Sequence, residues 1–179
     1  TVSSGYTVSQ PLALFAATSG NDALCNGVCN GNATVVASGG TGTYTYLWDD
    51  PNSQTNSVAT GLCAGNVNVI VTDLNACTSA TAYTVNQPAG IVLATSSVPA
   101  TCGNPDGQAI VTVSGGIGPY TYLWTQPAGA QTTDTATGLV AGIYTVTVTD
   151  NNGCSNSSTS IVNNTVPITN ISLSINASC

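Results

Sequence analysis

A ten-residue segment that combines glycines with alternating aromatic residues occurs twice in the chain. Residues 39–48 (GGTGTYTYLW) return as residues 115–124 (GGIGPYTYLW), with eight of ten positions identical at an offset of 76 residues. Further along, residues 71–77 align with residues 148–154 at an offset of 77 residues. Self-similarity at a fixed period is the signature of repeat architectures. The chain is therefore constrained to fold as a tandem array of similar small domains.

The same frame continues to both ends of the chain. Residues 6–11 (YTVSQP) resemble residues 83–88 (YTVNQP). Since both ends cut through a repeat, we expect the chain to be part of a longer polypeptide. The frame predicts four segments: the last strand of a preceding repeat over 1–11, whole repeats over 12–88 and 89–165, and the first strand of a following repeat over 166–179.

Each copy shows the residue pattern of β-strands. Alternate positions carry small, apolar or aromatic residues in residues 33–37, 109–113 and 144–148, which is the period of a strand with one buried face. Gly-Gly and Asn-Gly pairs separate these runs and predict turns. No window shows a helical period, and Thr, Val and Ser are poor helix formers. We predict an all-β fold of tandem immunoglobulin-like antiparallel β-sandwich domains without helices.

The charge balance excludes several classes of partner. The chain has no Lys, Arg or His, and seven acidic residues give it a net charge of −7. Nucleic acid and anionic lipid surfaces repel such a chain, because no basic side chain is present to displace their counterions. The apolar runs are also too short to cross a bilayer. We expect neither nucleic-acid binding nor membrane insertion.

The same composition argues against an enzyme. No His, Lys or Glu is available as a general base near neutral pH, so a Ser or Thr nucleophile has no activating partner. The carboxylates of Asp49 and Asp50 are adjacent in sequence and point to opposite faces of a strand. We therefore predict no catalytic residues and no cofactor.

Seven cysteines predict disulfides rather than metal ligands. Cys29 and Cys63 occur only in the first copy. Because both are gained together and the ends of an immunoglobulin-like sandwich bring such positions close, we predict that they bond to each other.

The remaining cysteines, Cys25, Cys77, Cys102, Cys154 and Cys179, recur with the repeat. One alternative pairs them within a repeat, as Cys25–Cys77 and Cys102–Cys154. The other pairs Cys25 of one repeat with Cys154 of the next and staples the junction. The second is slightly favoured, because an eight-residue strand spans about 26 Å and a disulfide joins Cα atoms about 6 Å apart.

Asp73 and Asp150 follow equivalent predicted strands in the two copies, and asparagines follow both. Oxygen-rich turns of this kind can bind calcium at domain junctions. The alternative is an Asx turn, which needs only one side chain. The Asx turn is favoured because few carboxylates are available to neutralise a dication. Asp73 and Asp150 are therefore only weak candidates for calcium ligands. No other metal site is expected.

Tyr44, Tyr46 and Trp48 occupy alternate positions and share one face of a predicted strand. Such a row can form a platform on which sugars stack, or it can supply core aromatics. The core is favoured, because a Trp at this place in an immunoglobulin-like sandwich is interior.

The repeated residues resemble a known family. The pattern C-x-G, G-x-A-x-V, G-G-x-G-x-Y-x-Y-x-W, G-L-x-A-G and V-x-V-T-D-x-x-G-C is similar to the SprB-type repeat, and it runs from Cys25 to Cys77 and from Cys102 to Cys154. Gly153 has Ala76 as its counterpart, which is a small departure. The family supplies very large surface adhesins of gliding Bacteroidota that the type IX secretion system exports. The resemblance therefore implies an extracellular, cell-surface location.

Within that family context, one short motif indicates modification. Residues 134–136 (DTA) resemble the O-glycosylation signal of Bacteroidota surface proteins, with Thr135 as the acceptor.

We expect a structural and adhesive repeat segment of a large extracellular protein, acting as a stiff stalk or fibre for surface attachment or gliding. Two other classes stay open: a subunit of a laterally packed extracellular filament, and a carbohydrate-binding module. The partners expected are neighbouring repeats of the same chain, other copies of the chain, or surface glycans.

The missing basic residues lead to a prediction about proteolysis. Trypsin cleaves after Lys or Arg, and the chain contains neither. Trypsin therefore leaves even the urea-unfolded chain intact at 17.7 kDa by mass spectrometry, whereas chymotrypsin, which cleaves after aromatic residues, fragments it. Tryptic fragments from a sample of verified sequence would contradict the prediction.

Overall fold

The computed structural model describes residues 5, 9–125 and 130–165. The chain divides into two compact units, Thr1–Gln87 and Pro88–Cys179, called unit 1 and unit 2 below. The predicted partial repeat over 166–179, with Cys179, lies outside the described residues, and most of the one over 1–11 does too.

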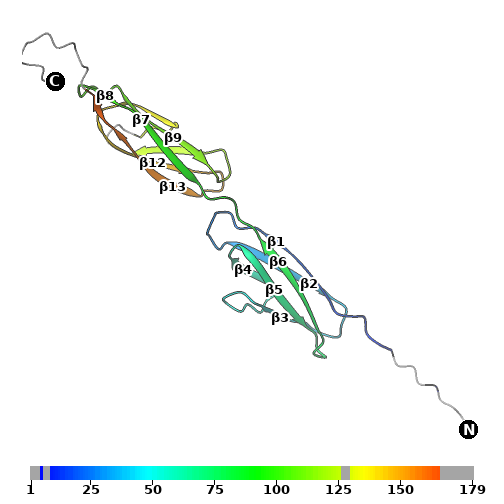
Figure 1. The fold of residues 1–179 in the computed structure, drawn as a ribbon. Coiled ribbons are helices and arrows are strands. Elements are labelled where there is room, and N and C mark those ends of the chain that lie inside the picture. Colours follow the sequence, from blue (N-terminus) through cyan, green and yellow to red (C-terminus); the bar gives the residue numbers. More distant parts are fainter. Residues whose placement is uncertain (1–4, 6–8, 126–129, 166–179) are drawn as a thin grey trace, which may run out of the picture. The chain divides into compact units, whose positions relative to one another are not determined.

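Among the described residues, unit 1 forms two three-stranded sheets. One has the order β1-β2-β4 and the other β3-β5-β6, with every neighbouring pair antiparallel (Figure 1). The chain thus passes from one sheet to the other after β2, β3 and β4, as in immunoglobulin-like sandwiches. The strands are β1 (Phe15–Asn21), β2 (Gly31–Ser38), β3 (Thr45–Trp48), β4 (Val58–Leu62), β5 (Gly65–Thr72) and β6 (Thr78–Val85).

Unit 2 repeats this topology, with sheets ordered β11-β9-β7 and β10-β12-β13. It adds one short parallel pair, in which Asn164 lies opposite Ala100. The strands are β7 (Val92–Val98), β8 (Ala100–Thr101), β9 (Gly107–Ser114), β10 (Thr121–Thr125), β11 (Thr135–Leu139), β12 (Gly142–Thr149), β13 (Ser155–Val162) and β14 (Asn164–Thr165).

The first and last strands of each unit lie side by side and run in the same direction. In unit 1 the Thr18 hydroxyl donates to the Ala82 carbonyl at 2.7 Å. In unit 2 the hydroxyls of Thr95 and Ser97 donate to the carbonyls of Thr159 and Ile161 at 2.8 and 2.7 Å. Because these strands are parallel, the chain enters a unit at one end and leaves it at the other. We call these the entrance end and the exit end.

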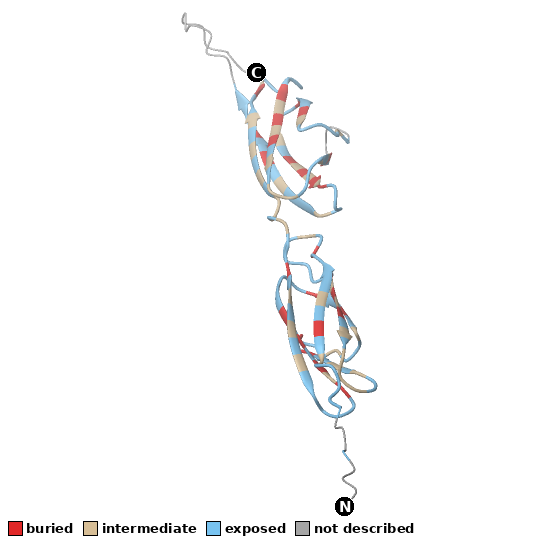
Figure 2. Cartoon of the chain, turned by 90° about the vertical axis from the view of Figure 1, so that its right-hand side faces the viewer, coloured by how far each residue is buried: buried red, intermediate tan, exposed pale blue. Residues whose placement is uncertain are grey.

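Each core is small and sits between the two sheets, as the buried bands on the strands show (Figure 2). It consists mainly of alanines and valines from alternating strand positions around one tryptophan per unit, with Leu62 in unit 1 and Leu139 and Tyr144 in unit 2. Trp48 and Trp124 are 1% and 2% exposed, and their indole N–H groups donate to the carbonyls of Asn56 and Thr133 at 2.8 and 2.9 Å. The three segments predicted from alternation lie in β2, β9 and β12.

The all-β prediction of antiparallel, immunoglobulin-like sandwiches is confirmed, and the described residues contain no helix. It follows that, within the described residues, no helix offers the length and apolar character of a membrane span.

The position of the tryptophan makes a prediction about stability. Trp48→Ala removes the largest buried side chain of unit 1, and such truncations cost about 3–5 kcal/mol. Leu47, the adjacent residue, is 51% exposed, so Leu47→Ala costs less than about 1 kcal/mol. Hydrogen exchange measured peptide by peptide is expected to lose protection across unit 1 for the Trp variant alone, with unit 2 as the internal reference. Equal effects of both substitutions would contradict this packing.

Candidate functional site

The repeated glycine and aromatic residues form a turn at the entrance end of each unit. Gly39 has φ of 74°, and a Cβ at this position would collide with the carbonyl oxygen of Ala13, just before β1. The Tyr44 hydroxyl donates to the Gly39 carbonyl at 2.7 Å. In unit 2, Tyr120 donates to the Gly115 carbonyl at 2.6 Å. The Gly-Gly and Tyr positions of the repeat therefore hold the incoming chain.

Asp73 and Asp150 complete the same turn from the opposite side. The Asp150 carboxylate accepts backbone N–H groups of Asn152 and Cys154 at Oδ1, both at 2.9 Å, and of Ile117 at Oδ2, at 3.0 Å. The Asp73 carboxylate accepts the equivalent three donors, from Asn75, Cys77 and Thr41, all at 2.9 Å. This is the geometry of an Asx turn extended by one contact across the entrance end.

The surroundings of these carboxylates do not suit calcium. The oxygens that would bind a cation already face N–H donors, whose positive ends repel it. Within the described ranges, no three His, Cys, Asp or Glu side chains gather closely enough to hold a metal ion. Asp73 and Asp150 lie in separate units and thus serve two copies of one turn.

The same donors keep both carboxyl groups ionised. The backbone N–H of Ile117 lowers the pKa of Asp150, burial opposes it, and the N–H groups of Cys154 and Asn152 lower the pKa further. For Asp73 burial is the largest influence and raises the pKa, but the N–H donors together outweigh it and the net pKa is lowered. Both residues are only 6% exposed, so their charge is held inside the turn.

The aromatic strands face the core. Trp48 and Trp124 are buried, and Tyr46 and Tyr122 are partly buried and pack against the core clusters. Among the aromatic residues that the structure describes, only Phe15 is exposed, at 62%. A platform of tryptophans for sugar stacking is therefore not present on these strands.

Cys29 and Cys63, the pair assigned to each other from the sequence, are joined by a disulfide with Cα atoms 3.9 Å apart. Cys29 precedes β2 and Cys63 follows β4, where Gly31 lies opposite Leu62. The bond therefore extends the β2–β4 ladder by a covalent rung at the exit end. At a sequence separation of 34 between the cysteines, chain-entropy arguments give it a stabilising effect of about 3–4 kcal/mol.

Cys25 lies in the turn between β1 and β2, at the exit end of unit 1. Its carbonyl accepts the N–H of Val28 at 3.3 Å. The same turn is tied to the outgoing chain, because the Gly27 N–H donates to Gln87 Oε1 at 2.7 Å. In unit 2 the equivalent turn carries Cys102, and there the Gly103 N–H donates to Asn164 Oδ1 at 2.9 Å.

Cys154 and Cys77 lie at the opposite, entrance ends. Each is the last residue of an aspartate turn, and each donates its backbone N–H to the aspartate of that turn. Cys77 is an exposed thiol. The two cysteines of one repeat are therefore at opposite ends of their unit.

Sequence reasoning missed two polar contacts that shape the exit end. Asn30 Oδ1 accepts the Leu24 N–H at 2.9 Å, and Asp106 Oδ1, its counterpart, accepts the Thr101 N–H at 2.8 Å. The second is the contact described above, in which a side-chain amide oxygen accepts a backbone N–H of the exit-end turn. Gln87 makes this contact in unit 1 and Asn164 makes the equivalent one in unit 2. The Gln-Pro pair at residues 87–88 could have indicated this contact from the sequence. In the second copy Asn164-Thr165 stands in its place, so the shared role of Gln87 and Asn164 was not apparent.

Thr135 is the first residue of β11 and is partly buried. Its hydroxyl donates to Asp134 Oδ1 at 3.1 Å, and its carbonyl accepts the Thr133 hydroxyl at 2.6 Å. The residues of the proposed glycosylation signal thus lie at an edge strand of unit 2.

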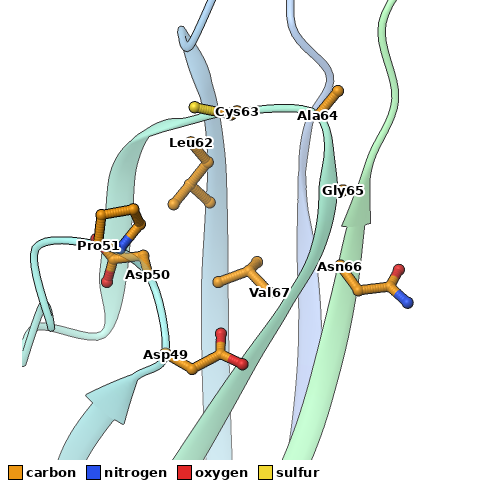
Figure 3. A pocket seen from close by; sticks show the side chains of 9 residues that line it. All are labelled: Asp49, Asp50, Pro51, Leu62, Cys63, Ala64, Gly65, Asn66 and Val67. Atoms are coloured by element: carbon orange, nitrogen blue, oxygen red, sulfur yellow. The ribbon is translucent and has the colours of Figure 1, made fainter.

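Asp49 and Asp50 both line a hollow of about 200 Å3 beside the connection from β4 to β5 (Figure 3). The Asp50 carboxylate accepts the backbone N–H and the side-chain amide of Gln54, both at 3.0 Å. Asp49 accepts the backbone N–H and side-chain amide of Asn68 at 2.7 and 2.5 Å. The side-chain amide of Asn68 is the main cause that lowers the pKa of Asp49. Separate amides hold the two carboxylates ionised, so neither can act as a general acid near neutral pH.

A second hollow, of about 360 Å3, lies beside Leu47, Ile70 and the Asp49–Asn68 pair. At the equivalent places of unit 2 stand Thr125 and Thr145, in place of Asp49 and Asn68. There the Thr125 hydroxyl donates to the Thr145 carbonyl at 3.5 Å. The polar lining is therefore not shared by the two copies, and it cannot carry a function common to the repeats.

Two segments of the chain, residues 17–53 and 94–129, match the family model of the SprB repeat. They occupy equivalent places, from the first strand of each unit through the Gly-Gly turn to the aromatic strand and the residues after it. The resemblance stated from the residues is thereby confirmed.

Solved structures similar to the chain contain Ig domains. The N-terminal eight Ig domains of Down Syndrome Cell Adhesion Molecule (DSCAM) isoform 1.30.30 share 10% identity at a TM-score of 0.43, over 85% of this chain and 31% of that chain. DIP-gamma IG1+IG2 shares 10% identity at a TM-score of 0.38, over 86% and 97%. A structure concerned with Dscam isoform specificity shares 11% identity at a TM-score of 0.32, over 83% and 47%.

The chain spans about a third and about half of the two Dscam structures. At TM-scores below 0.5 these similarities carry no argument, and the fold rests on the topology above. No curated protein matches the chain.

The lowered pKa of Asp150 makes a prediction about pH. A carboxyl group with a depressed pKa stabilises the folded state above its ordinary pKa of 3.8, and this contribution is lost as the pH falls through the lower folded value. Asp150→Asn is therefore expected to lower the melting temperature at pH 7, and the difference from wild type shrinks below pH 3.8. Asp134→Asn is the control, since among the described residues its side chain accepts only the Thr135 hydroxyl. A difference for Asp150→Asn that is constant with pH would contradict this role of the charge.

Proposed function

Two segments of the chain are SprB repeats, and from this premise we propose that it is a structural and adhesive segment of a large extracellular cell-surface protein. In this proposal the repeats form a stiff stalk or fibre that serves surface attachment or gliding. Its location outside the cell agrees with the disulfide between Cys29 and Cys63, because such bonds persist in oxidising compartments.

The observation that carries the proposal is the parallel arrangement of first and last strands. It places the entrance and the exit of the chain at opposite ends of each unit, which supports the proposal that added repeats lengthen the polypeptide. With strands of seven or eight residues, each repeat contributes about 35–40 Å, counting the strands and the end loops.

The stretch between the units offers little slack. It comprises residues 86–91, between the end of β6 at Val85 and the start of β7 at Val92. Each half is tied to its own unit: the Asn86 carbonyl accepts the Ala23 N–H at 2.9 Å, and the Ala89 carbonyl accepts the Gly116 N–H at 2.8 Å. A proline, Pro88, stands between these two contacts. A short, hydrogen-bonded connection of this kind supports the transmission of force along the chain.

The repeated motif residues support the proposal in a second way. The Gly-Gly pair, the first tyrosine hydroxyl and the aspartate of each motif are engaged in the entrance-end turn, and the tryptophans are engaged in the core. In the described part of the chain, no buried side-chain nitrogen or oxygen lacks a hydrogen-bond partner. The residues that the two copies share therefore maintain the fold, as expected for a spacer domain whose function depends on its shape.

One observation favours lateral packing as the alternative. The cross-strand pair of Ile143 and Ile161, on β12 and β13, is 65% and 58% exposed. Exposed apolar pairs on a sheet face suit a second chain, so a laterally packed filament is the second candidate function. A carbohydrate-binding module would depend on Phe15, the exposed aromatic.

Small-angle X-ray scattering of the chain and of a version with residues 12–165 duplicated tests the stalk. The maximum dimension is expected to grow by about 35–40 Å for each added repeat. A compact body would instead grow with about the 0.4 power of chain length. Growth of that smaller kind would overturn the proposal.

The same samples separate the alternatives. Scattering that rises with concentration, with uniform ribbons in electron micrographs, would support the filament in place of the stalk. Binding on a glycan array that is lost with Phe15→Ser but kept with Phe15→Tyr would support the carbohydrate-binding module.

A further inference from the structure

We propose that Gln54 and Gln131 close the outer edges of β4 and β11 against pairing with a β-strand from a second copy of the chain. Each glutamine lies in the segment that connects the two sheets of its unit, between β3 and β4 or between β10 and β11. The two residues stand 77 positions apart, and a threonine follows each of them. The inference goes beyond the proposed function, because it concerns which surfaces of a repeat are able to associate.

β4 and β11 are outer strands of their sheets. Among the described residues, β4 has β2 as its ladder partner and β11 has β9. The opposite edges of the two sheets, formed by the first and last strands of each unit, are closed against each other by hydroxyl contacts. An outer strand presents a row of backbone N–H and C=O groups, which is a template for pairing with another chain. The edges of β4 and β11 therefore need a cover.

Thr60 directs its backbone groups toward the outer edge of β4. The Val35 N–H of β2 donates to the Ser57 carbonyl at 2.9 Å, so Ser57 faces β2. In an antiparallel ladder, successive residues direct their N–H and C=O groups alternately to the two sides of the strand. Thr60 is three positions beyond Ser57 and is the middle residue of β4. Its N–H and C=O therefore point away from β2.

The Gln54 side chain binds both of these groups. The Thr60 N–H donates to Gln54 Oε1 at 3.0 Å, and Gln54 Nε2 donates to the Thr60 carbonyl at 2.9 Å. A side-chain amide carries the same kind of donor and acceptor as a peptide group. The two bonds thus reproduce one hydrogen-bonded residue pair of a β-ladder. Gln54 occupies the place that a residue of an added strand would take.

Unit 2 contains the same contact. The Val111 N–H donates to the Asp134 carbonyl at 2.9 Å, so Thr137, three positions further and in the middle of β11, faces the outer edge. The Thr137 N–H donates to Gln131 Oε1, and Gln131 Nε2 donates to the Thr137 carbonyl, both at 2.9 Å. The residues before the two glutamines differ, with DDPNS before Gln54 and TQPAGA before Gln131. The contact is therefore kept although the connecting sequence is not.

The backbone of each glutamine binds the outer strand of the other sheet. The Trp48 N–H donates to the Gln54 carbonyl at 3.0 Å, and the Trp124 N–H donates to the Gln131 carbonyl at 2.9 Å. These tryptophans belong to β3 and β10, which are also outer strands. Because both tryptophans are buried, they fix the position of the glutamine. One residue thus joins the two outer strands on this side of each sandwich.

Neighbouring side chains complete the cover in a different way in each unit. In unit 1 the Asp50 carboxylate accepts the backbone N–H and the side-chain amide of Gln54, both at 3.0 Å. The two amide hydrogens of Gln54 thus have one acceptor each, which fixes the orientation of the amide. In unit 2 the Thr133 hydroxyl donates to the carbonyl of Thr135 at 2.6 Å. Thr135 faces the same edge as Thr137, because the two residues are two positions apart.

Replacement of a glutamine by alanine removes the cover and leaves the strand in place. Two copies of an uncovered β4 are then able to pair antiparallel about a two-fold axis, and such a contact closes at the dimer. A chain with both glutamines replaced has two uncovered edges, β4 and β11. Its association therefore continues beyond the dimer.

Analytical ultracentrifugation of the full chain at increasing protein concentration tests the proposal. Q54A and Q131A are each expected to approach twice the weight-average mass of the wild type, and Q54A/Q131A is expected to exceed that limit. T55A and T132A change the exposed threonines that follow the glutamines and are the matched controls, which are expected to keep the mass of the wild type. A Q54A/Q131A chain no larger than the wild type would overturn the proposal.

Proline variants separate edge pairing from association caused by unfolding. Thr60→Pro and Thr137→Pro, introduced into Q54A/Q131A, remove the N–H groups to which an added strand would bind. Proline is tolerated on an outer strand where the N–H points away from the ladder. The prolines are expected to restore the mass of the wild type. Association that persists in their presence would show that the edges of β4 and β11 are not the site of pairing.

Hydrogen exchange of the wild type tests the cover without any substitution. The amide hydrogens of Thr60 and Thr137 are expected to exchange slowly, as hydrogen-bonded amides of a sheet do, although both point to an outer edge. Rapid exchange of both amides would contradict a closed cover.

These outcomes are distinct from the test of the stalk. Growth of the scattering dimension with each added repeat does not depend on the glutamines, so the stalk and the edge cover stand or fail separately. If the cover is present, copies that pack laterally must use sheet faces, such as the one that carries Ile143 and Ile161, instead of the edges of β4 and β11.

Discussion

The parallel contact between the first and last strands of each unit is the constraint on which the rest of the architecture depends. In both units the partners are 64 residues apart, as in Thr18 with Ala82 and Thr95 with Thr159. Hydroxyl groups make much of this contact, donating to backbone carbonyls of the neighbouring strand. Two edge strands of opposite sheets are thereby closed against each other, and the ends of the domain are separated by the full length of a strand.

The motif shared by the two copies is explained by the same constraint. Once the chain must enter at a fixed end, something has to hold the incoming residues against the sandwich. The Gly-Gly turn does so, because only a residue without Cβ fits beside the carbonyl of Ala13 or Gly90. Tyr44 and Asp73 then fix the turn through its carbonyl and its N–H groups. The identical residues are therefore concentrated at the entrance end, where they hold the incoming residues against the sandwich of the same unit.

The sequence was sufficient to predict the strands that carry the repeated pattern and the pairing of the two cysteines unique to the first copy. The alternation in residues 33–37 corresponds to β2, since a half-buried strand imposes a period of two on its side chains. It was not sufficient for β1, where the run from Phe15 to Asn21 has one buried residue and is otherwise mostly exposed. An edge strand that is exposed to solvent on both faces leaves little hydrophobic periodicity in the sequence.

Nor could the sequence reveal the contacts between the first and last strands or those at the exit end. Thr18 and Ser97 are two among many hydroxyl residues, and nothing local distinguishes the ones that reach across to the last strand. The shared role of Asn30 and Asp106 was concealed because an amide and a carboxylate oxygen accept the same backbone N–H equally well. Contacts made by one atom of a common side chain depend on the tertiary arrangement, which periodicity does not encode.

An acidic chain without a single basic side chain must stabilise its carboxylates by other means, and here hydrogen-bond donors replace cations. All seven aspartates accept such bonds, for example Asp22 from the N–H of Asn86 and Asp106 from the N–H of Thr101. Charge-assisted bonds to fixed amides are short-ranged and weakly affected by salt, whereas exposed ion pairs are screened within about 8–10 Å at physiological ionic strength. The fold therefore needs no ion pair between side chains.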